Sequence, residues 1–420
     1  MKGDVPCVQI YRTIRENVPS HARRLGIGRN LFPPAPALLR HLETAFSALG
    51  AQGRLSNYTS DEDERERELL AWLIERYLGG PRVPREAIFL TTGAQEAISL
   101  VATFAARKRL SSLLPLPLYY SFEQSSARWG VPVAGHYRYD GQCFWHDAPQ
   151  DLLLRVSVLP NGVTGTLFAP PRGGSARVAL SLVDCVFQMG GHVQAPLLAE
   201  AAREAVRQEG FERTALIFTA SKDLSLPGLR AGLLVSGNTE LLRFADEDRF
   251  ERYYSLNPLV SQVMLAYFTV LTVLTSGWGV YDEVRRAFLS LAVPVMTEDV
   301  LREVLAHVDA MTQRNRENLA RLLRHPLLEL GGEQAPVAGY SLLPRVRRPF
   351  RDGADFIAWV HRAGTEHELK LNPTLLFGAT QAVWDELYPG EHRIRVNVSD
   401  TPEELELTLT RLVSAAHAGC

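Results

Sequence analysis

Short apolar runs alternate with amphipathic helical segments between residues 46 and 290 of this 420-residue chain. The stretch at 87–110, AIFLTTGAQEAISLVATFAARKRL, has the pattern of a strand, a glycine turn and a helix, and the stretch at 111–130 repeats that order. Further apolar runs within 152–170, 178–191 and 214–237 have the length of buried strands. Strands separated by helices usually pair in parallel. The pattern therefore predicts an α/β fold, with a mostly parallel sheet of the seven-stranded type and helices on both of its faces.

The two ends of the chain depart from this alternation. Residues 1–45 are rich in proline, and we expect them to form an N-terminal arm and part of a small domain. A long helical stretch begins near residue 257 and leads to candidate strands within 341–346, 368–378 and 392–399. We therefore expect a large ligand-binding domain over 46–290 and a smaller C-terminal α+β domain over 291–420.

Composition excludes several classes of protein. The formal net charge is −2, so no bulk electrostatic attraction to nucleic acid or membranes is expected. The first residues lack the apolar core of a signal peptide, and no uninterrupted apolar run appears long enough to cross a bilayer. Four cysteines lie far apart without a CxxC pair, namely Cys7, Cys143, Cys185 and Cys420. Such spacing favours free thiols in a reducing cytoplasm over disulfides or a zinc site.

Chemically useful side chains follow the predicted strands at their carboxyl ends, where open α/β sheets bind ligands. Gly93-Ala94-Gln95 opens a helix, whose free N–H groups and dipole favour an anion. The other strand ends supply six further kinds of functional group. These are the aromatic ring of Tyr119, the amide of Asn161, the carboxylate of Asp184, the hydroxyl of Thr219, the amine of Lys222 and the guanidinium of Arg230. Lysine is seldom buried without a partner, so Lys222 directly after an apolar strand needs a chemical explanation.

This set of groups meets the chemical needs of pyridoxal phosphate. The phosphate needs N–H donors, a hydroxyl and an arginine. The pyridine nitrogen needs a carboxylate that keeps it protonated, so that the ring can accept electrons. The aldehyde needs a lysine amine, which partial desolvation activates. The sequence therefore predicts pyridoxal 5'-phosphate as the cofactor, and the eleven histidines show no spacing that predicts a metal site.

Residues 219–232, TASKDLSLPGLRAG, resemble the SxSKxxxxPGxRxG signature of the fold-type I pyridoxal-phosphate enzymes, the class I/II aminotransferases. Thr219 stands in place of the first serine, and the resemblance extends from Asn57 to Ser399. It implies an aspartate aminotransferase-like fold and a homodimer with shared active sites. It also implies a Schiff base between the cofactor and Lys222, which would later move the Cα proton of the substrate.

The resemblance implies roles for the other candidate residues. Asp184 would pair with the pyridine nitrogen, and Tyr119 would stack on the ring, although Tyr120 could equally do so. The phosphate would be surrounded by Gly93, Ala94, Gln95, Thr219, Ser221 and Arg230, with Tyr58 reaching it from a second subunit. Arg395 would bind the substrate α-carboxylate through a two-pronged contact, with Arg393 as the alternative on the same strand face.

Two of the departures from the family pattern fall on residues expected beside the cofactor. Phe187 stands where the family has a tyrosine that donates a hydrogen bond to the ring oxygen of the cofactor, and phenylalanine cannot donate. Asn161 is displaced by one residue from the asparagine of the family's NPTG segment. Either Asn161 takes over the hydrogen bond of that asparagine, or the bond is absent.

Three functions follow from these patterns. An aminotransferase, which moves an amino group between an amino acid and a 2-oxo acid, is the main expectation. SKDLSLPG also resembles 1-aminocyclopropane-1-carboxylate synthases, which are lyases acting on S-adenosylmethionine, while Asp-x-x-Phe and GEHRIRVNVS resemble oxygen-using arginine oxidases and hydroxylases. A cofactor-sensing regulator is disfavoured, because about fifty residues before the cofactor domain are too few for a DNA-binding domain and a linker.

Overall fold

The computed structural model describes residues 12, 18–56, 64–80, 82–146, 152–169, 171, 177–189, 195–252, 254–330 and 336–417. The chain folds into two compact units. Unit 1 comprises Met1–Phe32, Leu110–Arg177 and Met311–Cys420, and unit 2 comprises Pro33–Arg109 and Val178–Ala310. The predicted α/β class is confirmed, with a mostly parallel sheet and helices around it. The division into functional domains at 1–45, 46–290 and 291–420 stays a prediction.

Four paired strands form the centre of unit 2, in the order β2 (Ile88–Thr91), β9 (Gly232–Ser236), β8 (Thr214–Thr219) and β7 (Arg177–Asp184). The strands β7 and β8 are parallel, whereas β9 is antiparallel to both β2 and β8. Because β9 reverses direction between its two neighbours, β2 and β8 point the same way. Their carboxyl ends therefore lie at one edge, which is where the sequence predicts a ligand site.

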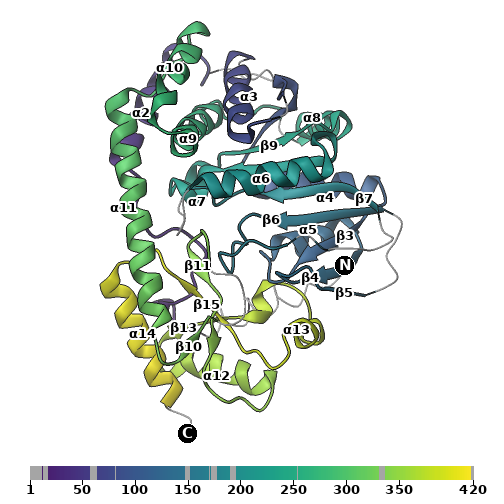
Figure 1. The fold of residues 1–420 in the computed structure, drawn as a ribbon, viewed down its shortest axis with the longest axis vertical. Helices are drawn as coiled ribbons and strands as arrows, with labels where there is room; N and C mark the ends of the chain where they lie inside the picture. The colour runs from purple at the N-terminus through teal and green to yellow at the C-terminus, as the bar shows by residue number, and fades with distance from the viewer. Residues whose placement is uncertain are drawn as a thin grey trace. The chain divides into compact units, whose positions relative to one another are not determined.

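Helices pack around these strands in two groups (Figure 1). α4 (Ala94–Arg107) contacts β8 and β9 and packs on α8 (Thr239–Arg252). The other group contains α3 (Glu64–Leu78), α6 (Ala195–Glu209) and α9 (Leu259–Ser276), of which α6 contacts β8 and α9 contacts β2 and β9. Unit 2 also contains α2 (Pro36–Ala51), α7 (Ala220–Asp223) and α10 (Tyr281–Ser290).

α9 is a strongly apolar helix that lies in the interior of the protein. Among the described residues it is a helix of 18 residues whose mean hydropathy of 1.7 would suffice, by length and composition, to cross a membrane. In the structure 78% of this helix is buried inside the protein, and every residue from Val260 to Val273 is buried. It contacts α2, α3, α6 and α7. A helix that is apolar on all sides is typical of the centre of a large core.

Unit 1 contains a second run of four strands, in the order β6 (Leu152–Val158), β3 (Ser111–Pro115), β4 (Val133–Tyr137) and β5 (Cys143–Trp145). The first three are parallel, and β5 is an antiparallel edge strand on β4. α5 (Ser121–Trp129) contacts β3.

The remainder of unit 1 consists of short paired strands and helices from both ends of the chain. β15 (Ile394–Asn397) pairs antiparallel with β11 (Ser341–Leu342) and β14 (Asn372–Pro373). β1 (Arg23–Arg24) pairs parallel with β13 (Leu369–Lys370), and β10 (Leu328–Glu329) pairs antiparallel with β12 (Arg345–Val346). Its helices are α12 (Gly353–Glu366), α13 (Gln381–Leu387) and α14 (Pro402–His417), and α11 (Glu298–Leu323) contains the unit boundary.

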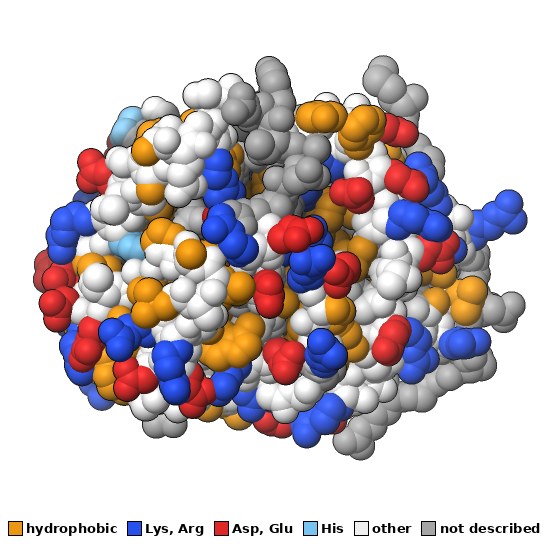
Figure 2. Space-filling model, turned by 90° about the horizontal axis from the view of Figure 1, so that it is seen from above, with side chains coloured by type: hydrophobic (Ala, Val, Ile, Leu, Met, Phe, Trp, Pro, Cys, Tyr) orange, Lys and Arg blue, Asp and Glu red, His pale blue; other side chains and the backbone are white. Residues whose placement is uncertain are grey.

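Charges of both signs are mixed on the surface. On the face drawn in Figure 2, Lys and Arg side chains alternate with Asp and Glu side chains, with apolar side chains between them. This distribution agrees with the small net charge of the chain and contains no extended patch of one sign on that face.

Candidate active site

The candidate site in unit 2 is built around the first residue of β9. Thr91, the last residue of β2, and Thr219, the last residue of β8, both pair with Gly232. A Cβ atom at position 232 would lie 2.7 Å from the Cα of Gly93, so only glycine permits this approach. The register therefore brings the start of α4, the turn of α7 and the residues before β9 to the same edge.

A guanidinium lies over the start of α4. Gly93 is the N-cap residue of this helix and has a φ of 85°, which favours glycine. Arg230 donates from its terminal nitrogen to the carbonyl of Thr92 at 3.2 Å. A Cβ atom on Gly93 would lie 2.9 Å from that nitrogen. The absence of a side chain thus leaves room for Arg230 beside the first N–H groups of the helix, which Ala94 and Gln95 provide.

Two hydroxyls lie at the neighbouring strand end. Thr219 is the N-cap of α7, and its side-chain oxygen accepts a hydrogen bond from the Ser221 amide at 3.2 Å. The same hydroxyl donates to the carbonyl of Ala231 at 2.7 Å and lies 2.9 Å from the hydroxyl of Ser221. These contacts hold the α7 turn against the start of β9. Arginine, helix N–H groups and hydroxyls together can bind a phosphate.

The charges of Asp184 and Lys222 act on each other within unit 2. Asp184 is the last residue of β7, is 4% exposed, and its Oδ1 has no hydrogen-bond partner among the described residues. Burial raises the pKa of Asp184 to about 7, although the positive charge of Lys222 and a bond from the Val186 backbone both act to lower it. A buried carboxylate oxygen without a donor is rare in folded proteins and makes Asp184 a candidate functional group.

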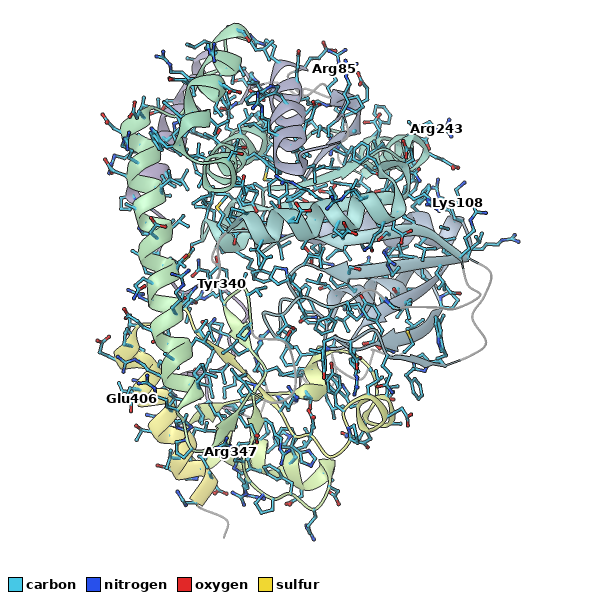
Figure 3. All side chains as sticks on the ribbon, viewed as in Figure 1. Arg85, Lys108, Arg243, Tyr340, Arg347 and Glu406 are labelled. Atoms are coloured by element: carbon cyan, nitrogen blue, oxygen red, sulfur yellow. The ribbon has the colours of Figure 1, made fainter. Side chains whose placement is uncertain are left out.

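Lys222 lies in the second half of the α7 turn and is partly buried. The chain has only three other lysines, Lys2, Lys108 and Lys370. Lys108 is exposed and paired with Glu240, and Figure 3 shows it at the periphery. Of the lysines that the structure describes, Lys222 is therefore the one whose charge acts on the buried Asp184.

Phe187 follows Asp184 by three residues and is buried in unit 2. Its ring carries no hydroxyl, so the side chain at this position cannot donate a hydrogen bond. Tyr58 lies outside the described residues.

Unit 1 carries the other predicted site residues. Tyr119 precedes α5, is 45% exposed, and its ring centroid lies 4.7 Å from that of Tyr120. Asn161 follows β6 and is 1% exposed. Its amide donates to the carbonyl of Pro117 at 2.7 Å, and its oxygen accepts from the amides of Val163 and Thr164. Asn161 therefore holds its own loop together and joins it to Pro117. The apolar periodicity of the sequence could not predict these hydrogen bonds.

Arg395 lies in β15 and Arg393 directly precedes it, and the two arginines differ in their surroundings. Arg393 is buried, forms an ion pair with Glu391, and donates to the carbonyl of Leu343 at 3.1 Å. Arg395 is partly exposed, and its Nε donates to the carbonyl of Gly26 at 2.8 Å. Its guanidinium carbon lies 4.8 Å from the ring centroid of Phe377.

The N-terminal segment contacts Arg395 through Gly26 and Gly28, and the sequence pattern did not predict this contact. A Cβ atom on Gly28 would lie 2.9 Å from a terminal nitrogen of Arg395, and one on Gly26 would lie 2.4 Å from its carbonyl oxygen. The two glycines in LGIGRN are the signal that could have indicated this close approach of backbone to side chain.

Replacing Asp184 by asparagine should stabilise the ligand-free protein at pH 8 by roughly 1–3 kcal/mol, because a buried charge with one unbonded oxygen is removed. The folded pKa of Asp184 is raised from 3.8 to about 7. Its stabilising contribution is therefore present at low pH and is lost as the pH rises through about 7. Urea unfolding of both proteins at pH 4 and pH 8 measures this difference. Equal stability at pH 8 would contradict the proposed cost of burial.

Comparisons with known proteins identify the fold. No protein-family model and no curated protein matches the sequence. The structure is similar to N-succinyldiaminopimelate aminotransferase from Mycobacterium tuberculosis, with a TM-score of 0.65 and 17% identity over 98% of this chain and 97% of that one. Aminotransferase AspB from Helicobacter pylori gives a TM-score of 0.66 and 15% identity over 100% of both chains. Aspartate aminotransferase from Thermotoga maritima gives 0.62 and 15% over 97% of this chain and 94% of that one. The chain therefore has the aspartate aminotransferase-like fold.

Proposed function

We propose that this protein is a pyridoxal-phosphate-dependent aminotransferase that carries its cofactor on Lys222. The observation that carries the proposal is the buried Oδ1 of Asp184, which has no hydrogen-bond partner among the described residues although the charge of Lys222 acts on the same carboxylate. A cationic N–H group of a ligand would satisfy that oxygen. The aminotransferase fold of the neighbours supports the same conclusion.

The residues of unit 2 fit the cofactor. A protonated pyridine nitrogen would donate to Asp184 and, by its positive charge, keep the carboxylate ionised at neutral pH. The N–H groups of Ala94 and Gln95, the hydroxyls of Thr219 and Ser221, and Arg230 provide the donors that a phosphate needs. The space left by the missing Cβ of Gly93 permits the guanidinium to lie at that position.

Pyridoxal phosphate, when bound, supplies an aldehyde that joins an amine and a ring that delocalises negative charge. The chain supplies the rest. Lys222 provides the amine and would exchange a proton with the Cα of the substrate. Asp184 holds the proton on the ring nitrogen, and Tyr119 offers an exposed aromatic face for stacking.

The attachment site can be mapped directly, because the chain offers only four lysines. Borohydride reduction of the protein loaded with pyridoxal phosphate should fix the cofactor on the peptide that contains Lys222. Peptide mass spectrometry identifies the residue, and Lys222→Ala serves as the control that should bind no reducible cofactor. A label on Lys2, Lys108 or Lys370 instead would refute the assignment.

Arg395 is the better candidate for the substrate carboxylate, because Arg393 is buried and ion-paired with Glu391 whereas Arg395 is partly exposed. Arg395→Lys should raise the KM for the amino acid about tenfold or more, since lysine cannot form a two-pronged contact. The visible spectrum of the bound cofactor should not change. Arg393→Lys is the matched control, and we expect lower thermal stability with a KM within about threefold of wild type. The opposite pattern would transfer the role to Arg393.

A second candidate reaction is favoured by the surroundings of the cofactor ring oxygen. Phe187 has no hydroxyl, and the Asn161 amide group already donates to the carbonyl of Pro117, while its oxygen accepts from two amides of its own loop. Fewer donors at that oxygen would leave negative charge less stabilised there. This favours fates of a carbanion other than reprotonation, such as oxidation by O₂ or elimination from S-adenosylmethionine.

The reaction type is decided by the co-substrate that turnover requires. An aminotransferase should convert amino acids only when a 2-oxo acid regenerates the cofactor, with no oxygen consumption. A panel of amino acids assayed with and without a 2-oxo acid, with an oxygen electrode and with S-adenosylmethionine measures this dependence. Sustained turnover without a 2-oxo acid would contradict the aminotransferase assignment and support the second candidate.

The assembly and location are further parts of the proposal. We infer a homodimer with shared active sites, in which Tyr58 reaches the phosphate of the second subunit. A cytoplasmic location is supported by Cys143 and Cys185, which are free thiols in the described part of the chain. For the proposed reaction, the partners are an amino acid and a 2-oxo acid, and we expect no binding to nucleic acid or membranes.

A further inference from the structure

A second buried carboxylate lies directly after Lys222. Asp223 is 2% exposed, and its Oδ2 accepts a hydrogen bond from the backbone N–H of Gln188 at 2.7 Å. The same oxygen accepts from the hydroxyl of Tyr267 at 3.1 Å. The hydroxyl of Tyr77 in turn donates to the side-chain oxygen of Gln188. These four residues form a connected polar network inside unit 2.

The network connects the two segments that carry the proposed chemistry. Gln188 follows Asp184 by four residues, and Asp223 follows Lys222 by one. The bond between Asp223 and Gln188 therefore joins the loop after β7 to the α7 turn. Tyr267 belongs to the buried helix α9, and Tyr77 belongs to α3. Both helices are parts of the core, so the network fixes the two segments to a rigid support.

The α7 turn needs such support. It has four residues, which is too short for a helix to be stable by itself. The Thr219 hydroxyl caps its beginning, and Asp223 is its last residue. Consecutive side chains on a helix point about 100° apart, so Asp223 can face the core while Lys222 faces the site. The exposure of the two residues agrees, since Asp223 is buried and Lys222 is partly exposed.

The donors of the network keep their protons over a wide pH range. Burial raises the pKa of the Tyr267 hydroxyl well above its usual value, and the charge of Asp223 raises it further. Burial also raises the pKa of Tyr77, with added contributions from Cys185 and Asp223. Both hydroxyls therefore remain donors, and the contact between Asp223 and Tyr267 is not disrupted near neutral pH.

We propose that Asp223 is a positioning residue, which sets the placement of Lys222 relative to Asp184 by holding the α7 turn against the loop at 185–188. The proposal rests on the proposed function for its consequence, because the placement matters only if a cofactor bridges Lys222 and Asp184. Loss of Asp223 leaves the N–H of Gln188 and the hydroxyl of Tyr267 buried without their acceptor, which loosens both segments.

The test compares Asp223→Ala, Asp223→Asn and wild type. Asp223→Ala should speed amide hydrogen exchange in the segment 185–189 of the cofactor-free protein by about tenfold, the expected effect of losing a buried hydrogen bond. Release of pyridoxal phosphate to a scavenging apoenzyme should also accelerate about tenfold, and kcat should fall more than KM changes. Asp223→Asn should recover most of each effect, because its amide oxygen can accept from Gln188.

Asp352→Ala provides the matched control. Asp352 caps α12 in unit 1 and accepts from the amide of Asp355 at 2.8 Å, so it too is an aspartate that binds a backbone N–H. Its loss should lower the thermal unfolding midpoint, as the loss of a helix cap does. Exchange at 185–189 and cofactor release should stay within about twofold of wild type. Equal acceleration in this control would show a general loss of stability and overturn the proposal.

The remaining outcomes are also decisive. If Asp223→Ala does not fold, Asp223→Asn and Tyr267→Phe carry the test, and Tyr267→Phe should accelerate exchange at 185–189 about threefold because one of two donors is lost. Wild-type exchange and cofactor release in the folded variants would overturn the proposal. Failure of wild type to hold pyridoxal phosphate on Lys222 would instead refute the proposed function. In that case the exchange measurement, made without cofactor, still decides whether Asp223 holds the loop.

Discussion

The candidate site depends on the approach of β9 to its two neighbours at Gly232. β9 runs antiparallel between β2 and β8, so the carboxyl ends of those strands face the same edge. Gly232 has no Cβ, and the Cα of Gly93 occupies the space where one would lie. Only this approach allows the start of α4, the cap of α7 and Arg230 to provide donors together. A larger residue at position 232 would push the start of α4 away from β9 and so separate the parts of the site.

Two buried aspartates in unit 2 show how similar groups acquire different tasks. Asp223 accepts bonds from a backbone amide and a tyrosine, so its charge is satisfied by the protein itself. Asp184 has an oxygen with no such donor among the described residues, and burial raises its pKa to about 7. A satisfied buried carboxylate stabilises its surroundings, whereas an unsatisfied one is stabilised by a ligand that brings a proton and positive charge.

Local spacing made some of these features predictable. The turn from Thr219 to Gly232 could be anticipated because its residues lie within one strand-turn-strand segment, where sequence distance limits distance in space. The strand ends at Gly93 and Asp184 followed from apolar runs and the rule that ligands bind beyond carboxyl ends. Asn161 and the choice between Arg393 and Arg395 could not be settled in this way. Their contacts come from residues such as Pro117, Gly26 and Leu343, which are distant in sequence from them.

The amino-acid sequence by itself determined the α/β class, the position of Lys222 after a buried strand, and the charged and hydroxyl groups around it, because periodicity and short spacings are local properties. Tertiary structure alone decided which carboxylate keeps an unsatisfied oxygen, which partners surround Arg393 and Arg395, and that α9 is a core helix. It also decided that Asp223 joins the α7 turn to Gln188. Burial and hydrogen bonding depend on partners brought together from separate segments, and a pattern along one segment carries no information about them.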